Sequence, residues 1–130
     1  MPNYGSMREM IEAAERGDLD TQHHVGACYA TGDWDGPKDA AQAIQWYTRA
    51  AEAGHPLSQY DLGFMLMLGE GTEKDIEKGL WWIEQAANNG EAHAARLLAD
   101  IYETGHFEVI ADPNRAKYWQ ERYEELRKGI

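Results

Sequence analysis

The stretch LGFMLMLGEGTEKDIEKGLWWIEQAANNG, residues 62–90, decides the fold because its landmarks recur along the chain. An earlier copy, offset by 36 or 37 residues, supplies the equivalents Gly26, Gly32, Asp39, Trp46, Ala50, Ala51 and Gly54. A weaker later copy supplies Ala99, Tyr102, Gly105, Asp112 and Trp119. Repetition at this period is typical of helical solenoids, in which each unit buries its apolar face against its neighbours.

Each copy is predicted to form two helices, because capping residues bracket two segments per copy. The expected helix starts carry aspartate N-caps, at Asp18, Asp39, Asp75 and Asp112. The expected ends carry glycine, which adopts the left-handed conformation of a C-cap without steric cost. We predict seven helices and no strand, with the helices at residues 6–16, 19–31, 39–53, 57–68, 75–89, 91–104 and 113–128.

These helices are expected to form one all-α domain over residues 1–130. It would consist of an N-terminal half repeat at 6–17, two repeats at 18–54 and 55–90, and a third repeat with a capping helix at 91–130. Small residues stand in the middle of the first helix of each repeat, at Gly26, Gly63 and Ala99. Glycine there costs about 1 kcal/mol relative to alanine, which indicates close packing of helices. The tryptophans Trp46, Trp82 and Trp119 are expected to fill the groove within each unit.

The composition describes a soluble and strongly acidic domain. Hydrophobic residues make up 43% of the 130, and 12 Lys and Arg against 23 Asp and Glu give a formal charge of −11. This charge argues against binding to nucleic acid or to an anionic membrane surface, and it favours basic partners. Cys28 is the single cysteine, so no disulfide within the chain is possible. With no apolar signal-peptide core and no long apolar run, we expect a cytoplasmic protein.

No motif for catalysis, cofactor binding or metal binding stands out. His23 and His24 are adjacent, so on a helix their side chains diverge by about 100° and do not face one metal ion. The run DWDG at 33–36 lacks the later carboxylates of a calcium loop and is predicted to be a turn. Cys28 lies in a predicted packed helix and is expected to be a core residue. We therefore expect no enzyme activity and no cofactor.

The repeated residues resemble the SEL-one-like repeats, which are relatives of the tetratricopeptide repeats. That pattern has a leucine–glycine pair, a glycine-x-glycine loop, a lysine–aspartate pair, a tryptophan, an alanine pair and a closing glycine, and residues 62–90 match it nearly throughout. The third copy departs from it, with Tyr123 and Glu124 in place of the alanine pair. The resemblance implies a short right-handed solenoid with a concave face lined by the first helix of each unit. It also implies an adaptor or scaffold role.

The same resemblance implies which residues would bind a partner on the concave face. Those residues are His23, Tyr60, Phe64, Met67, Leu68, Arg96, Asp100 and Glu103. Their centre is an apolar strip of Tyr60, Phe64 and Met67, and Leu62 and Leu66 are assigned instead to the core. Three things could bury this strip: a partner protein, the neighbouring helices of the same chain, or a second copy in a homodimer. A monomer and a homodimer both stay open.

The leading functional prediction is a non-enzymatic protein–protein interaction module that holds a protein or peptide, with a basic one favoured by charge, on its concave face. The alternative is an immunity protein that neutralises a bacterial toxin, a role in which proteins resembling this family are found. A β-lactamase-like hydrolase is less favoured. The relatives with that activity have a disulfide in each repeat, and a chain with Cys28 alone departs from their pattern.

Overall fold

The computed structural model describes residues 6–34 and 36–129, and within them every regular element is helical. Seven α-helices and one short 3-10 turn follow one another along the chain. They are α1 (Met7–Glu15), α2 (Leu19–Thr31), α3 (Ala40–Glu52), α4 (Pro56–Leu68), α5 (Ile76–Asn88), α6 (Ala92–Thr104), η1 (His106–Glu108) and α7 (Pro113–Arg127). The predicted all-α class and the seven helices are confirmed.

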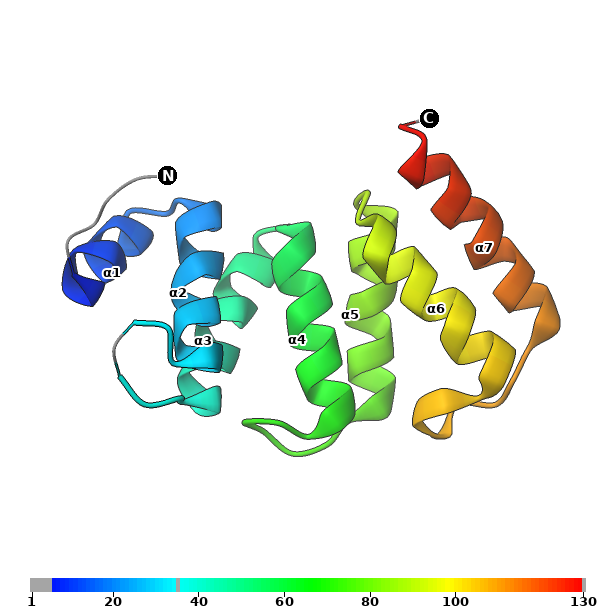
Figure 1. The fold of residues 1–130 in the computed structure, drawn as a ribbon, viewed down its shortest axis with the longest axis horizontal. Coiled ribbons are helices and arrows are strands. Elements are labelled where there is room, and N and C mark those ends of the chain that lie inside the picture. Colours follow the sequence, from blue (N-terminus) through cyan, green and yellow to red (C-terminus); the bar gives the residue numbers. More distant parts are fainter. Residues whose placement is uncertain (1–5, 35, 130) are drawn as a thin grey trace.

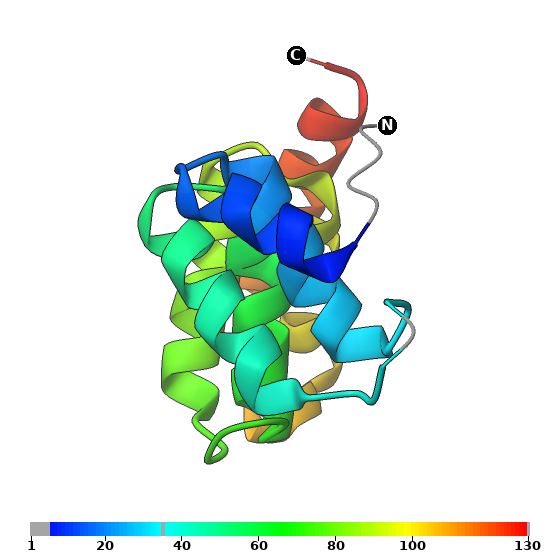
Figure 2. The same cartoon turned by 90° about the vertical axis from the view of Figure 1, so that its left-hand side faces the viewer.

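The helices stack as hairpins into a short α-solenoid (Figure 1). The pairs α2–α3, α4–α5 and α6–α7 succeed one another along the long axis, and α1 packs on α2 at one end. A quarter turn of the view shows α3 and α5 forming a second row beside α2 and α4 (Figure 2). We call the surface formed by α2, α4 and α6 the first-helix face.

Capping residues explain where the helices begin and end. The carboxylate oxygens of Asp39, Asp75 and Asp112 accept hydrogen bonds from backbone N–H groups in the first turns of α3, α5 and α7. Asp18 also precedes its helix, but its carboxylate accepts a hydrogen bond from the Thr21 hydroxyl instead. Gly32, Gly69 and Gly105 end the first helices of the three pairs with φ between +74° and +79°, as the sequence predicts. The expected turn at 33–36 includes Asp35, which lies outside the described residues.

The core is divided among three apolar clusters, each of which joins consecutive helices. The first cluster consists of Met10, Ala14, Val25, Cys28 and Trp46, from α1, α2 and α3. The second consists of Ala43, Tyr47, Ala51, Leu62, Met65 and Leu66, from α3 and α4. The third, from α4 to α7, includes Met67, Ile83, Leu98, Ile101, Tyr102 and Trp119. Each repeat therefore buries its apolar side chains against its neighbours, as expected of a solenoid.

The repeated tryptophans and small residues take the packing positions that the sequence predicts. Trp46 and Trp119 are each 7% exposed, and each lies in a cluster that includes the first helix of its own unit. The small residues lie at close helix contacts. A methyl group added to Gly26 would come within 2.8 Å of the Tyr47 ring, which itself belongs to the core. Real Cβ atoms essentially never approach so closely, so the glycine is required by the packing.

Candidate interaction surface

The predicted apolar strip exists on α4, with one change of membership. Tyr60 and Phe64 lie one helical turn apart, with ring centroids 6.4 Å apart and planes inclined by 9°. Both are half-buried, and Leu68 at the end of the same helix is 46% exposed. Phe107 from η1 rests with its ring edge on Phe64, at a centroid distance of 6.0 Å and an interplanar angle of 76°. Tyr60, Phe64, Leu68 and Phe107 make up what we call the aromatic strip.

Met67 does not belong to this accessible strip, so the prediction that placed it there is wrong. Its side chain is 1% exposed and lies in the core cluster that also contains Ile83 and Leu98. The cause is Gly79 on α5, where any added side-chain carbon would collide with Met67. Because Gly79 leaves a hollow, the flexible methionine side chain turns into it and away from solvent.

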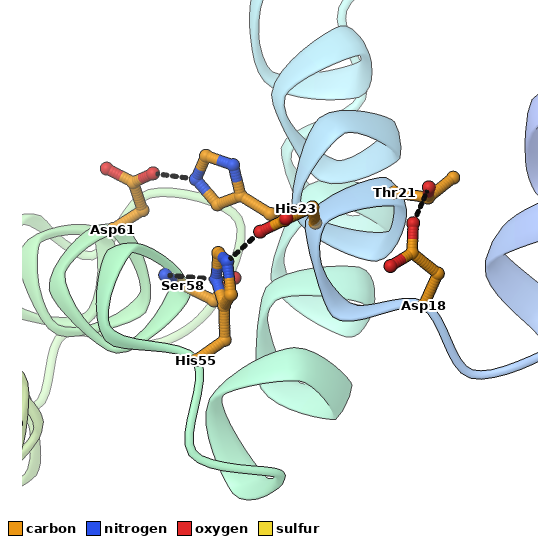
Figure 3. Close-up of polar contacts among 7 residues, drawn as sticks. Asp18, Thr21, His23, His55, Ser58 and Asp61 are labelled. Carbon is orange, nitrogen blue, oxygen red and sulfur yellow. Dashed lines mark hydrogen bonds and ion pairs between the residues drawn. The ribbon is translucent and has the colours of Figure 1, made fainter. Parts of the chain in front are cut away.

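His23 of the first unit is occupied by contacts within the chain (Figure 3). Its Nε2 lies 2.7 Å from Oδ2 of Asp61 on α4, and its ring packs against those of Tyr47 and His55 at 5.3 Å. Only 20% of the His23 side chain is exposed. His23 therefore mainly connects α2 to α4, and little of its side chain is accessible to a partner.

A second histidine makes a parallel tie between the same two helices. Nδ1 of His55 accepts a hydrogen bond from the backbone N–H of Ser58, so His55 is the N-cap of α4. Its Nε2 therefore carries the proton and donates to Oδ1 of Asp20 on α2, at 2.8 Å. The two histidine–aspartate pairs link the consecutive first helices α2 and α4. The sequence reasoning did not identify His55.

The predicted residues of the third unit line two pockets that meet on α6. The first pocket has a volume of about 440 Å³ and is lined by Tyr60, His93, Arg96, Leu97 and Asp100. The second has a volume of about 430 Å³ and is lined by Arg96, Ala99, Asp100, Glu103, Gln120, Tyr123 and Glu124. Arg96 and Asp100 border both, so they form a ridge between the α4–α6 pocket and the α6–α7 pocket. Among the predicted residues, Tyr60, Arg96 and Asp100 share the first pocket, and Arg96, Asp100 and Glu103 share the second. The other four predicted residues line neither pocket: His23, Phe64, Met67 and Leu68.

The structure adds residues to the surface that sequence reasoning missed. Phe107 lies in a loop outside the helical repeat pattern, so no periodicity marks it. Its backbone is left-handed, with φ +59°, and so is that of Glu108, with φ +65°. Such a conformation is uncommon for a bulky side chain and indicates a constraint from the surroundings. The Phe107 ring packs against the Phe64 ring, and Glu108 forms an exposed ion pair of 3.2 Å with Lys74.

The charges around the surface are mostly negative. Burial raises the pKa of Tyr60, and the nearby Asp61 and Glu91 raise it further, against the opposing effect of Arg96. The Tyr60 phenol is therefore neutral at physiological pH. A hydrogen bond of 2.8 Å from Arg127 holds the pKa of the Glu124 carboxyl below its ordinary value, so Glu124 is ionised.

Three observations on the described part of the chain concern a reactive thiol, a metal site and a membrane span. Cys28 is buried, and burial, together with Asp33, raises the pKa of its thiol, which disfavours the reactive thiolate. Over residues 6–34 and 36–129, no three His, Cys, Asp or Glu side chains are grouped so as to hold a metal ion. None of the helices in those residues combines the length and the apolar character that a membrane span requires.

Comparison with known proteins gives a consistent family match. The model of the Sel1 repeat matches three successive segments, residues 19–55, 56–91 and 92–122. Among curated proteins, the chitin synthase regulator SKT5 of Saccharomyces cerevisiae is 34% identical over 94 residues, which cover 72% of this chain and 14% of the regulator. The chain thus spans about a seventh of the length of that relative.

Solved structures share the fold. A Sel1 repeat protein from Oxalobacter formigenes superposes with a TM-score of 0.83 at 28% identity, covering 95% of this chain and 49% of that one. The protein c5321, a protective antigen of uropathogenic Escherichia coli with an SLR fold, also gives a TM-score of 0.83, at 32% identity, covering 92% of this chain and 25% of that one.

Proposed function

The chain belongs to the Sel1 repeat family, and from that premise we propose that it is a non-enzymatic module that binds a protein or peptide on its first-helix face. Sel1 repeat proteins generally mediate protein–protein interactions. The observation that carries the proposal is the stacked pair Tyr60 and Phe64, half-exposed beside the α4–α6 pocket. The core of the domain does not fully bury these two rings, so part of their apolar surface is accessible to a partner.

The composition of the surface supports protein recognition. Protein interfaces are enriched in tyrosine, phenylalanine and arginine at the centre, with a polar rim. Here Tyr60, which stacks on Phe64, shares a pocket with Arg96, and Arg96 borders both pockets. The side chains of Asp100 and Glu103, which line the second pocket, are exposed. The histidine–aspartate pairs hold α2 and α4 in one arrangement, so less conformational freedom is lost when a partner binds.

The relatives support a regulatory rather than a catalytic role. The similar yeast protein is named a regulator of chitin synthase, and the similar segment is a small part of it. In the present chain we propose the corresponding physical role, in which the repeats hold another protein and the partner carries the activity.

An immunity protein would use the same face and differ only in its partner, which would be a toxin. The formal charge of −11 supports this alternative to the extent that the toxin is basic, since charge complementarity speeds association. The identity of the captured partner distinguishes the two roles.

The test combines partner capture with matched substitutions on two faces. The tagged chain is cross-linked in extract from the source organism, captured proteins are identified by mass spectrometry, and each candidate is purified for calorimetry. We expect Tyr60→Ala and Leu68→Ala to weaken binding, with at least about a tenfold loss for Tyr60→Ala. The control is Trp81→Ala on α5, where Trp81 is 51% exposed in the second row of helices.

Circular dichroism and thermal melting establish that each variant is folded before its affinity is compared. A partner that binds Tyr60→Ala and Leu68→Ala as tightly as the parent, but loses affinity for Trp81→Ala, would move the binding site to the other row of helices and overturn the proposal.

A further inference from the structure

We infer that the partner places a lysine or arginine side chain in the α6–α7 pocket while an apolar side chain of the same segment packs on Tyr60 in the α4–α6 pocket. This inference rests on the proposed function and adds to it the chemical class of the partner: an extended segment in which an apolar and a basic residue are spaced to reach two neighbouring pockets.

The α6–α7 pocket has the form that a long basic side chain requires. Its lining combines the buried Ala99, the half-buried ring of Tyr123 and the carboxylates of Asp100, Glu103 and Glu124. Lysine and arginine bury their methylene stems on apolar surface and keep the charged head among polar groups. A tyrosine ring offers apolar surface to the stem, and it adds a favourable cation–π contact where the charged head lies over the ring.

The carboxylates around this pocket are incompletely neutralised by the chain itself. Glu124 is paired with Arg127 at 2.8 Å, and Asp100 lies 3.7 Å from His106. Arg96 contributes one positive charge to the lining, against the three carboxylates of Asp100, Glu103 and Glu124. The hydrogen bond that Glu103 receives comes from the neutral side-chain amide of Gln120, at 3.3 Å. Glu103 therefore offers an ionic acceptor to an incoming cation, and the overall charge of −11 attracts basic segments from a distance.

The position of the ridge predicts the order and spacing of the two partner residues. Arg96 and Asp100 border both pockets. The α4–α6 pocket adds Tyr60, His93 and Leu97, and the α6–α7 pocket adds two further carboxylates, those of Glu103 and Glu124. The apolar residue therefore suits the first pocket and the basic residue suits the second. The two pockets lie on either side of α6. A helix with its side chains is about 10–12 Å across, and an extended chain advances about 3.3 Å per residue. The two partner residues are accordingly expected about three positions apart.

The experiment selects peptides from a random displayed library against the full chain, and then measures the affinity of the winners for variants. We expect enrichment of an apolar or aromatic residue with lysine or arginine about three positions away. Glu103→Gln, which preserves shape, is expected to weaken these peptides about fivefold, and Glu103→Lys to select peptides with an acidic residue in place of the basic one. Glu77→Lys on α5, an exposed position outside both pockets, is the matched charge control.

Salt dependence gives a second readout. The affinity of the parent chain for the selected peptides should fall as ionic strength rises, and the fall should be shallower for Glu103→Gln. Peptides that need Tyr60 but lack a basic residue, or that bind Glu103→Gln and the parent equally, overturn this inference and leave the proposed function standing. Peptides that bind independently of Tyr60, or the failure of any peptide to be enriched, count against both.

Discussion

Gly63 in α4 lies directly against the backbone of Gly79 in α5. A methyl group on Gly63 would come within 2.7 Å of the Gly79 carbonyl oxygen, and one on Gly79 within 2.6 Å of the Gly63 carbonyl oxygen. The equivalent crossings pair Gly26 with Ala43 and Ala99 with Ala116, so only the middle repeat has glycine on both helices. At this crossing the aromatic strip on α4 is held by backbone-to-backbone contact.

Gly63→Ala is therefore expected to destabilise the protein by about 1–3 kcal/mol, even though alanine is the better helix former by about 1 kcal/mol. The backbone of Gly79 cannot move aside as a flexible side chain would. Urea denaturation measures the change, with Gln45→Ala at an exposed position of α3 as the control. A Gly63→Ala variant more stable than the parent would show that the two helices are not in close contact.

Two buried glutamines at equivalent positions differ in one hydrogen bond. Gln22 and Gln59 each donate from Nε2 to the carbonyl oxygen of a residue in the preceding helix, at 3.1 Å. The Oε1 of Gln59 accepts a hydrogen bond of 2.9 Å from Asn89, the C-cap of α5. The Oε1 of Gln22 is buried and has no such donor, because the equivalent C-cap of α3 is Ala53.

Ala53→Asn is expected to supply the missing donor and to stabilise the protein by about 0.5–1.5 kcal/mol. Ala53 has φ −86° and ψ 3°, close to the φ −93° and ψ 13° of Asn89, so the backbone already suits the substitution. The reverse change, Asn89→Ala, should cost about 1–3 kcal/mol because Gln59 Oε1 loses its donor. A double-mutant cycle with Gln22→Ala is the check, since a gain that persists without Gln22 would have another origin.

The left-handed backbone of Glu108 is expected to reduce stability. Its φ of +65° is unfavourable for any residue with a side chain. Its ion pair with Lys74 involves side chains that are 51% and 74% exposed, and such exposed pairs contribute little. Glu108→Gly should therefore raise the free energy of unfolding by about 0.5–1 kcal/mol. The control, Glu121→Gly within α7, should lower it by about 1 kcal/mol; equal effects of the two changes would contradict the assignment of strain to η1.

The buried phenol of Tyr47 links stability to alkaline pH. Burial raises the pKa of Tyr47 well above its ordinary value of 10.0, and Asp61 adds to the effect. Because the folded state disfavours the phenolate, the unfolded state releases the proton first. The contribution of Tyr47 to the free energy of unfolding is fully present below pH 10 and is lost as the pH rises above 10. Denaturation measured at pH 8 and at pH 10.5 should show that the free energy of unfolding falls less for Tyr47→Phe than for the parent chain. Equal falls would exclude Tyr47 as the cause.

Features that repeat along the chain could be predicted from the sequence, and features that occur once could not. Gly26, Gly63 and Trp46 recur at fixed spacing, and their packing could be predicted because each repeat solves the same packing problem. Met67 was misplaced because its orientation depends on Gly79, a residue of another helix whose effect no periodicity reveals. Phe107 and His55 were missed for a related reason: their contacts, with Phe64 and Asp20, join segments far apart in the sequence.

Self-association is the remaining alternative for the aromatic strip, and we expect the chain to be a monomer in solution. Phe107 already covers one edge of Phe64, which leaves Tyr60 and Leu68 as the main apolar contacts for a second copy. Two copies would also bring together like charges of −11 each. Size-exclusion chromatography with light scattering measures the mass, at low and high salt. A dimer that Tyr60→Ala and Leu68→Ala dissociate, but Trp81→Ala does not, would show that the strip pairs with itself and that a partner protein must compete with a second copy for the same surface.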